Sequence, residues 1–153
     1  MIKFCKEMWD KNQDALKEAL RNDVTLNECE YVDLLKLVVK HVLNNNNAGI
    51  EWNPNQITKI DNGDYQGTLL FLIPQDTYQP GEYEYLMTYV GYGSCSGCDT
   101  LKSIQDWSEN KPPTEQQLKD YMTLCRDLVV RMIKPYNSGW MNEEIFETVA
   151  EEV

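Results

Sequence analysis

The chain has 153 residues, with 14 Lys and Arg, 25 Asp and Glu and one His, which gives a formal net charge of -11. Hydrophobic residues make up 42% and charged residues 25%, the proportions of a folded globular protein and not of a disordered chain. This length and composition predict one domain, residues 1–153. The charge argues against a nucleic-acid-binding protein, and no apolar run approaches the roughly 20 residues that span a bilayer.

The N-terminal third has the periodicity of two helices. Apolar side chains recur at spacings of four and seven over residues 4–21. Thr25 and Glu28 have the spacing of a capping box, which predicts that a second helix begins at Thr25. Its apolar positions continue to Val42, and the asparagine-rich stretch 44–49 ends it. The two helices are expected to form an antiparallel hairpin.

The middle third has the shorter period of β-strands. An Asn-Gly pair between extended runs predicts a two-residue hairpin turn, across which Asp61 faces Asp64. Residues 67–73 form an apolar run that predicts a central strand buried on both faces. Alternation over residues 83–90 predicts a third strand, whose tyrosine face lies either beneath the helices or against a partner protein.

The last third is helical again. A short helix is expected to begin at Asp99 or Thr100, with Trp107 facing inward. A longer helix is capped by Thr114, and Asn142 can cap a final one. Because helices and strands are segregated along the chain, the sequence predicts an α+β fold. In this fold, an antiparallel sheet of three to four strands is covered by the N-terminal hairpin and the C-terminal helices.

The densest motif is YGSCSGCDTL, residues 92–101, between the third predicted strand and the short helix. A Cys-x-x-Cys pair in this position is typical of thiol oxidoreductases, because a helix N-terminus stabilises the thiolate of the first cysteine. In that interpretation Cys95 attacks a disulfide and Cys98 resolves the mixed disulfide. A second interpretation makes the pair half of a structural zinc site. The other two ligands would then come from among four isolated residues: Cys5, Cys29, Cys125 or His41.

Two further interpretations of this motif need neither redox chemistry nor metal. Gly91, Gly93 and Gly97 can form a backbone nest for an anion at a helix N-terminus. Alternatively, the segment is a glycine-rich turn in which two small thiols pack as hydrophobic side chains. The charged N-terminus is unlike a secretory signal, so the cysteines are expected to stay reduced in the cytoplasm. The leading interpretation therefore includes no cofactor, and zinc is the alternative.

The same motif also carries a resemblance. Together with the apolar run at residues 69–73, YGSCSGCDTL resembles a segment of small acidic proteins encoded by bacteriophages and prophages of Gram-positive bacteria, a group with no named activity. The likeness extends over roughly residues 50–110. It implies a non-structural protein made in the cytoplasm of an infected or lysogenic bacterium, and it assigns no catalytic residue.

Acidic side chains are concentrated in the middle of the chain. Residues 51–100 contain one basic and seven acidic residues, a net charge of -6, which repels nucleic acid and anionic lipid and attracts a basic protein surface. We therefore expect a non-enzymatic protein that binds, and for example inhibits, a basic host protein such as one that binds nucleic acid. Self-association is a further alternative. The side chains expected to contact the partner are Asp61, Asp64, Asp76, Tyr78, Glu82 and Glu84.

Overall fold

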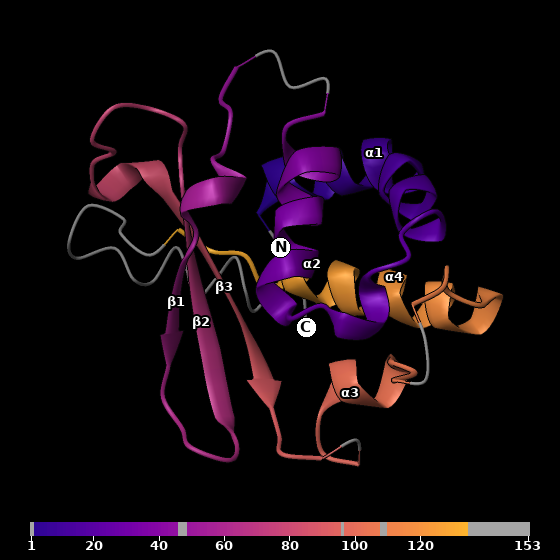
Figure 1. Cartoon of the computed structure of the whole chain (residues 1–153). Helices are drawn as coiled ribbons and strands as arrows, with labels where there is room; N and C mark the ends of the chain where they lie inside the picture. Colours follow the sequence, from indigo (N-terminus) through magenta and orange to yellow (C-terminus); the bar gives the residue numbers. More distant parts are fainter. Residues whose placement is uncertain (1, 46–48, 96, 108–109, 135–153) are drawn as a thin grey trace.

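A three-stranded antiparallel sheet with helices packed against one of its faces forms the architecture (Figure 1). The structure is a computed structural model and describes residues 2–45, 49–95, 97–107 and 110–134. The α+β class predicted from the sequence is confirmed, with the strands in the order β1-β2-β3. The elements are, in chain order, α1 (Lys3–Arg21), α2 (Tyr31–Val38), β1 (Thr58–Asp61), β2 (Gly67–Pro74), β3 (Tyr85–Tyr92), α3 (Thr100–Ile104) and α4 (Glu115–Val130).

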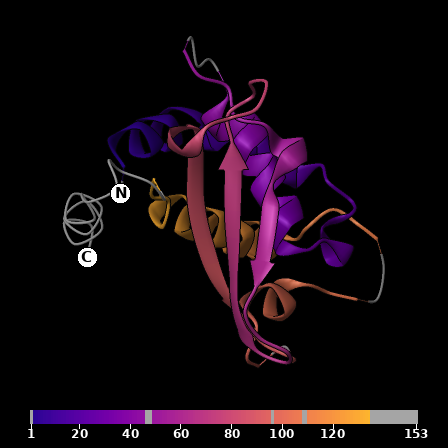
Figure 2. The same ribbon diagram turned by 90° about the vertical axis from the view of Figure 1, so that its left-hand side faces the viewer.

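The helical layer consists of α1, α2 and α4, which lie together on one side of the sheet (Figure 1, Figure 2). α2 continues directly into a π-helical turn, Val39–Leu43. Asn12 of α1 is 4% exposed, and its Nδ2 donates to the carbonyl oxygens of Val42 and Asn45 at 2.8 Å each. A buried amide needs such partners, and the end of a helix leaves carbonyls without an intrahelical donor. These hydrogen bonds fix α1 to the end of the π-helical turn.

The second helix begins later than the sequence predicts. The hydroxyl and the N–H of Thr25 both donate to the Asp23 carboxylate, at 2.6 and 2.8 Å, and Thr25 forms no side-chain cap. A short 3-10 helix follows at Leu26–Glu28. The capping box of α2 is formed instead by Glu30 and Asp33. The predicted capping box at Thr25 is wrong because Asp23 engages that residue in a local turn.

The two faces of the sheet have different surroundings. On the face against the helices, Phe71 and Val90 are buried, and the Thr88 hydroxyl donates to the Leu128 carbonyl of α4 at 2.6 Å. No described helix covers the opposite face (Figure 2). The prediction that residues 67–73 are buried on both faces is therefore wrong. The apolar side chains of this outer face are partly exposed: Ile60, Leu70, Leu72, Met87 and Tyr89.

β3 begins after a short 3-10 helix at Glu82–Glu84. Its residues Tyr85 and Tyr89 lie on the outer face of the sheet, so the helices cover the face opposite the tyrosines. The edge of β3 is paired at one point with the segment that follows α4. There the N–H groups of Met87 and Ile133 each donate to the other residue's carbonyl oxygen at 2.8 Å.

The β1–β2 connection is longer than the predicted two-residue turn. Asp61 pairs with a residue of β2 and does not face Asp64, and residues 62–66 separate the strands. The side chain of Asn62 accepts a hydrogen bond from the N–H of Thr68 at 2.7 Å. This side-chain contact bridges the ends of the loop, so the Asn-Gly pair lies within a wider connection and not at the tip of a tight turn.

The helices after the sheet follow the sequence prediction in part. Thr114 and Gln117 form the predicted capping box of α4, and Asp99 caps α3. Trp107 is 66% exposed because α3 ends three residues earlier, so the prediction that it faces inward is wrong. The final helix predicted at Asn142 lies outside the described residues. Within the described part of the chain, every helix is too short or too polar to cross a membrane.

Candidate functional site

The Cys-x-x-Cys motif forms an exposed turn between β3 and α3. The Sγ atoms of Cys95 and Cys98 lie 2.8 Å apart, and both side chains are exposed. The backbone N–H of Cys98 donates to the carbonyl oxygen of Cys95 at 3.1 Å, and the N–H of Cys95 donates to Sγ of Cys98 at 3.2 Å. Both cysteines are free. The turn thus holds two thiols in direct contact at the protein surface.

Gly93 leaves the space in which Cys98 lies. A Cβ atom at residue 93 would be 2.5 Å from the carbonyl oxygen of Cys98 and 2.6 Å from its Sγ, closer than van der Waals contact allows. A Cβ atom at Gly91, two residues earlier in β3, would meet nothing nearer than 3.9 Å. Residue 93 therefore has to be glycine for the chain to make this close approach.

A buried carboxylate anchors both ends of the turn. Asp99 is 5% exposed and accepts three hydrogen bonds, from the N–H of Gly93 at 3.0 Å, the hydroxyl of Tyr31 at 2.8 Å and the N–H of Lys102 at 3.0 Å. The Tyr31 oxygen in turn accepts from the N–H of Leu101 at 3.0 Å. Burial raises the pKa of Tyr31, so its hydroxyl remains a donor. The end of β3, the start of α2 and the start of α3 are joined through this one side chain.

The α3 N-terminus serves this anchor and not a thiolate. The N–H of Lys102, in the first turn of α3, points to the Asp99 carboxylate, and so does the N–H of Gly93. The thiol-redox interpretation expected helix donors to stabilise Cys95, and the anion-nest interpretation expected the glycine N–H groups to bind an external anion. In the structure a carboxylate of the chain itself accepts from the N–H groups of Gly93 and Lys102.

The pKa of Cys98 in the turn and the pKa values of the three cysteines elsewhere in the described chain are shifted in opposite directions. Hydrogen bonds from the thiol and the backbone N–H of Cys95 lower the pKa of Cys98, because they stabilise its thiolate. Burial disfavours a thiolate, and it raises the pKa of each of the other three cysteines to about 12. These three are Cys5, Cys29 and Cys125.

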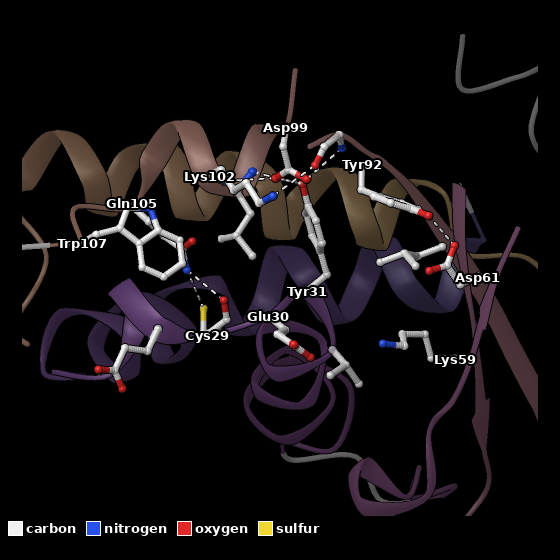
Figure 3. Close-up of a pocket in the computed structure, with 15 residues that line it drawn as sticks. Cys29, Glu30, Tyr31, Lys59, Asp61, Tyr92, Asp99, Lys102, Gln105 and Trp107 are labelled. Carbon is white, nitrogen blue, oxygen red and sulfur yellow. Dashed lines mark hydrogen bonds between the residues drawn. The ribbon is translucent and has the colours of Figure 1, made fainter. Parts of the chain in front are cut away.

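A groove of about 320 Å³ lies beside the turn, between the start of α2, the sheet and α3 (Figure 3). Trp107 lies at one end, and Lys59 and Asp61 lie at the other (Figure 3). Gly93 and Asp99, which flank the turn, both line it. Its apolar lining is formed by Val32, Leu69, Tyr92, Leu101 and Trp107.

The charged side chains of the groove include both signs. The lining contains Glu28, Glu30 and Asp61 together with Lys59 and Lys102. Because carboxylates and ammonium groups share this small volume, the groove has no strong preference for a simple anion or a simple cation.

One wall of the groove is held by a contact between β1 and β3. The Tyr92 hydroxyl donates to the Asp61 carboxylate at 2.5 Å. This hydrogen bond lowers the pKa of Asp61 and raises the pKa of Tyr92 to about 12. Asp61 also accepts from the N–H of Gly63 at 3.0 Å. Its carboxylate is therefore occupied by contacts within the chain.

The acidic residues expected to contact a partner fall into two groups. Asp61 and Asp64 lie at the β1–β2 connection, whereas Asp76 and Tyr78 lie in the connection from β2 to β3. The two connections are at opposite ends of the eight-residue strand β2, about 25 Å apart at about 3.4 Å per residue. The structure thus separates Asp61 and Asp64 from the rest.

The β2–β3 connection brings the remaining candidates together. Asp76 is exposed, and Tyr78 is 92% exposed. The Glu84 carboxylate accepts from the N–H of Gly81 at 3.1 Å and so helps to close this connection. The side chain of Glu82 lies outside the described part of the structure.

Among the described residues, no group of three or more His, Cys, Asp or Glu side chains is arranged to hold a metal ion. Cys5 and Cys125 are buried in the core, and Cys29 contacts the amide of Gln105. His41 lies in the π-helical turn. The proposed additional zinc ligands are therefore not gathered at the Cys-x-x-Cys turn.

Three residues of the site are not among the functional candidates predicted from the sequence: Tyr31, Lys102 and Trp107, the last of which was expected only to face inward. Tyr31 and Asp99 are 68 residues apart in the chain, so no local pattern indicates their contact. Lys102 donates from Nζ to the Gly93 carbonyl at 3.3 Å, a contact made only when α3 folds back along β3.

No family model, curated protein or solved structure matches the chain.

Proposed function

We propose that the protein exchanges thiols and disulfides through Cys95 and Cys98. The observation that carries this proposal is the 2.8 Å separation of two exposed Sγ atoms. A disulfide bond is about 2.05 Å long, so these atoms need to approach by less than about 1 Å to bond. The lowered pKa of Cys98 favours the thiolate, which is the attacking form of a cysteine.

The reaction has two steps. The Cys98 thiolate attacks one sulfur of a substrate disulfide, the substrate S–S bond breaks, and the first substrate thiolate leaves and takes a proton from water. Cys95 then loses its proton to water and attacks Sγ of Cys98 in the mixed disulfide, which releases the second substrate thiolate. The protein dithiol is oxidised to a disulfide by two electrons, and the substrate disulfide is reduced to two thiols. An external dithiol restores the reduced protein.

This order of attack is the reverse of the one expected from the sequence. There, Cys95 was assigned the first attack because a helix N-terminus would stabilise its thiolate. Here the hydrogen bonds of the turn stabilise a thiolate at Cys98. The proposal therefore assigns the first attack to Cys98 and the resolving step to Cys95.

The test follows disulfide formation in four proteins: the native chain, Cys98→Ser, Cys95→Ser and the matched control Cys29→Ser. Each reduced protein is incubated with oxidised glutathione and analysed by mass spectrometry. The native chain and Cys29→Ser should each lose the mass of two hydrogen atoms, whereas Cys95→Ser should accumulate a mixed disulfide and Cys98→Ser should react slowly. Equal reaction rates for Cys98→Ser and the native chain would contradict the proposal.

A second candidate function is favoured by the exposed tyrosines of the β2–β3 connection. Tyr78 and Tyr83 are 92% and 58% exposed, and the acidic residues Asp76 and Glu84 lie in the same connection. Tyrosine provides a large contact area at low entropic cost, and carboxylates steer a basic partner. The connection is therefore proposed to bind a basic protein, such as a nucleic-acid-binding protein of the host bacterium that the phage resemblance implies.

This candidate is tested by the affinity for a purified basic DNA-binding protein at low and high salt. Tyr78→Ala and Asp76→Lys should both weaken binding, and binding by the native chain should fall as salt screens the charges. Tyr65→Ala is the matched control, because Tyr65 is 81% exposed but lies at the other end of the sheet. Binding that is independent of salt, or equally weakened by Tyr65→Ala, would contradict this candidate.

A further inference from the structure

We infer that the groove beside the Cys-x-x-Cys turn binds a polypeptide segment of the disulfide substrate, with an apolar side chain of that segment seated against Trp107. This inference rests on the proposed thiol exchange and adds its substrate class. The substrate would be a disulfide-bearing peptide or unfolded chain with a large apolar residue near its half-cystine. A small free disulfide would not use the groove.

The position of the groove relative to the thiols is the first observation. Gly93 and Asp99 line the groove and also bound the turn that contains both cysteines. Cys98 directly precedes Asp99, whose carboxylate is fixed by hydrogen bonds to β3, α2 and α3. Cys98 also packs against Gly93, so a segment that is bound in the groove and extends past Gly93 can reach the attacking sulfur, and the Asp99 anchor holds the groove and the turn together.

The second observation is the placement of Trp107. Its side chain is 66% exposed, yet the chain before it is held firmly. Gln105 donates from Nε2 to the carbonyl oxygens of Leu26 and Cys29 at 2.8 Å each, and the N–H of Asp106 donates to the side chain of Asn27 at 2.9 Å. An aromatic side chain presented to solvent by an anchored backbone is a typical contact residue for a partner.

The third observation is the size and chemistry of the groove. Its volume of about 320 Å³ is near the lower limit of ligand pockets, which hold about 300–1,000 Å³. This space suits one or two side chains of an extended peptide and is too small for a folded domain. The apolar lining includes Leu69 and Leu101, and the charged lining includes both Lys59 and Glu30. A polypeptide, which carries apolar groups and both charges, matches this lining better than a small ion.

The test compares three disulfides of thionitrobenzoate: one with a hexapeptide that has leucines beside its cysteine, one with the glycine-flanked hexapeptide, and the symmetric reagent without peptide. Release of the coloured thiol by the reduced protein gives a second-order rate constant for each. The native chain should react about tenfold faster with the leucine peptide than with the glycine peptide, the effect of one good aromatic contact. Trp107→Ala should abolish this preference, because it slows the reaction with the leucine peptide more than the reaction with the symmetric reagent.

Two controls make the result specific to the groove. Tyr78→Ala removes a more exposed aromatic side chain in a connection that does not line the groove and should keep the preference for leucine. Trp107→Phe keeps an aromatic ring and should retain most of the preference for the leucine peptide. A third measurement is independent of thiol chemistry. Calorimetry measures how tightly the leucine peptide, without its disulfide, binds to the Cys95→Ser/Cys98→Ser double variant. That binding should also be lost with Trp107→Ala.

The possible failures can be told apart. If the native chain reacts with all three disulfides at rates insensitive to Trp107→Ala, the groove inference is wrong and the thiol exchange stands. If Trp107→Ala slows the symmetric reagent as much as the leucine peptide, Trp107 acts on the thiols and not on docking, which also overturns the inference. If the native chain reacts with none of the three, the proposed function and the inference both fail.

Discussion

Cysteines in the helical core and cysteines in the β3–α3 turn have opposite chemistry. Cys5 and Cys125 are 0% exposed, and burial raises the pKa of each thiol to about 12. Cys95 and Cys98 are exposed and lie 2.8 Å apart, and hydrogen bonds lower the pKa of Cys98. The comparison shows how the surroundings set the pKa of a thiol: an apolar shell disfavours the thiolate, and a tight turn with converging N–H and S–H donors favours it.

The Cys-x-x-Cys turn nevertheless depends on a buried group, and the largest predicted effect comes from removing it. Asp99→Ala deletes an acceptor of three hydrogen bonds and leaves two buried donors, the Tyr31 hydroxyl and the Gly93 N–H, unsatisfied. We expect the free energy of unfolding to fall by about 3 kcal/mol. Urea denaturation measures this change. Asp64→Ala, which removes an exposed carboxylate, is the control and should have little effect; an equal loss in the two variants would contradict the role of Asp99.

The next largest effect is predicted for Gly93→Ala. The new Cβ would overlap the carbonyl oxygen and Sγ of Cys98, so the turn has to open. Overpacking of this kind costs about 2 kcal/mol, and the two sulfur atoms should separate. Gly93→Ala should therefore unfold at a lower urea concentration than the native chain, and it should form a disulfide more slowly with oxidised glutathione. Gly91→Ala is the matched control, since its Cβ meets no atom within 3.9 Å, and disulfide formation by both variants at the native rate would refute this account.

The pH dependence of alkylation compares the two regions directly. Because only the thiolate reacts, the rate for Cys98 should reach half its maximum below the pKa of a free cysteine, about 8.5. Cys125, with its pKa raised to about 12 by burial, should stay unmodified until the protein unfolds. Iodoacetamide labelling followed by mass spectrometry of the peptides gives both profiles. A profile for Cys98 that lies above that of free cysteine would contradict the stabilised thiolate.

The smallest effect is predicted for Tyr92→Phe, at the wall of the groove. The hydrogen bond from the Tyr92 hydroxyl lowers the pKa of Asp61 in the folded protein. This contact therefore stabilises the fold at pH values above the pKa of the unfolded carboxyl, about 3.9. The contribution is lost as the pH falls through the lower pKa of the folded state. In Tyr92→Phe the pKa of Asp61 should rise towards its usual value. NMR titration of the Asp61 carboxyl measures the shift. Tyr89→Phe is the control, and an equal shift there would remove the assignment to Tyr92.

The elements with local signals were predictable from the sequence. The Thr114 and Gln117 capping box marks the start of α4, and apolar alternation marks β3, because capping and periodicity involve only neighbouring residues. Local signals can also mislead. The predicted start of α2 at Thr25 is wrong because the residue types of a capping box can also form a local turn, here between Thr25 and Asp23.

The candidate site was predictable only in its cysteines. Their spacing and position between a strand and a helix are local, but the Asp99 anchor needs Tyr31, which is 68 residues away in the chain. Trp107 has the spacing of an inward residue, and its exposure follows from the early end of α3, where Gln105 bonds to Leu26 and Cys29. Contacts between distant segments therefore supply the anchor and the groove, and a single sequence contains no direct record of them.

The edges of the sheet have a consequence for how the molecule behaves at high concentration. The outer face is apolar, and such a sheet invites strand addition by other chains. β1 is a short edge of four exposed residues that include Lys59 and Asp61, and charges on an edge strand oppose pairing with a neighbour. The edge of β3 is engaged at Met87 by Ile133. Among the described residues, charges at one edge and a pairing at the other thus oppose growth of the sheet into fibrils, although no described helix covers its outer face.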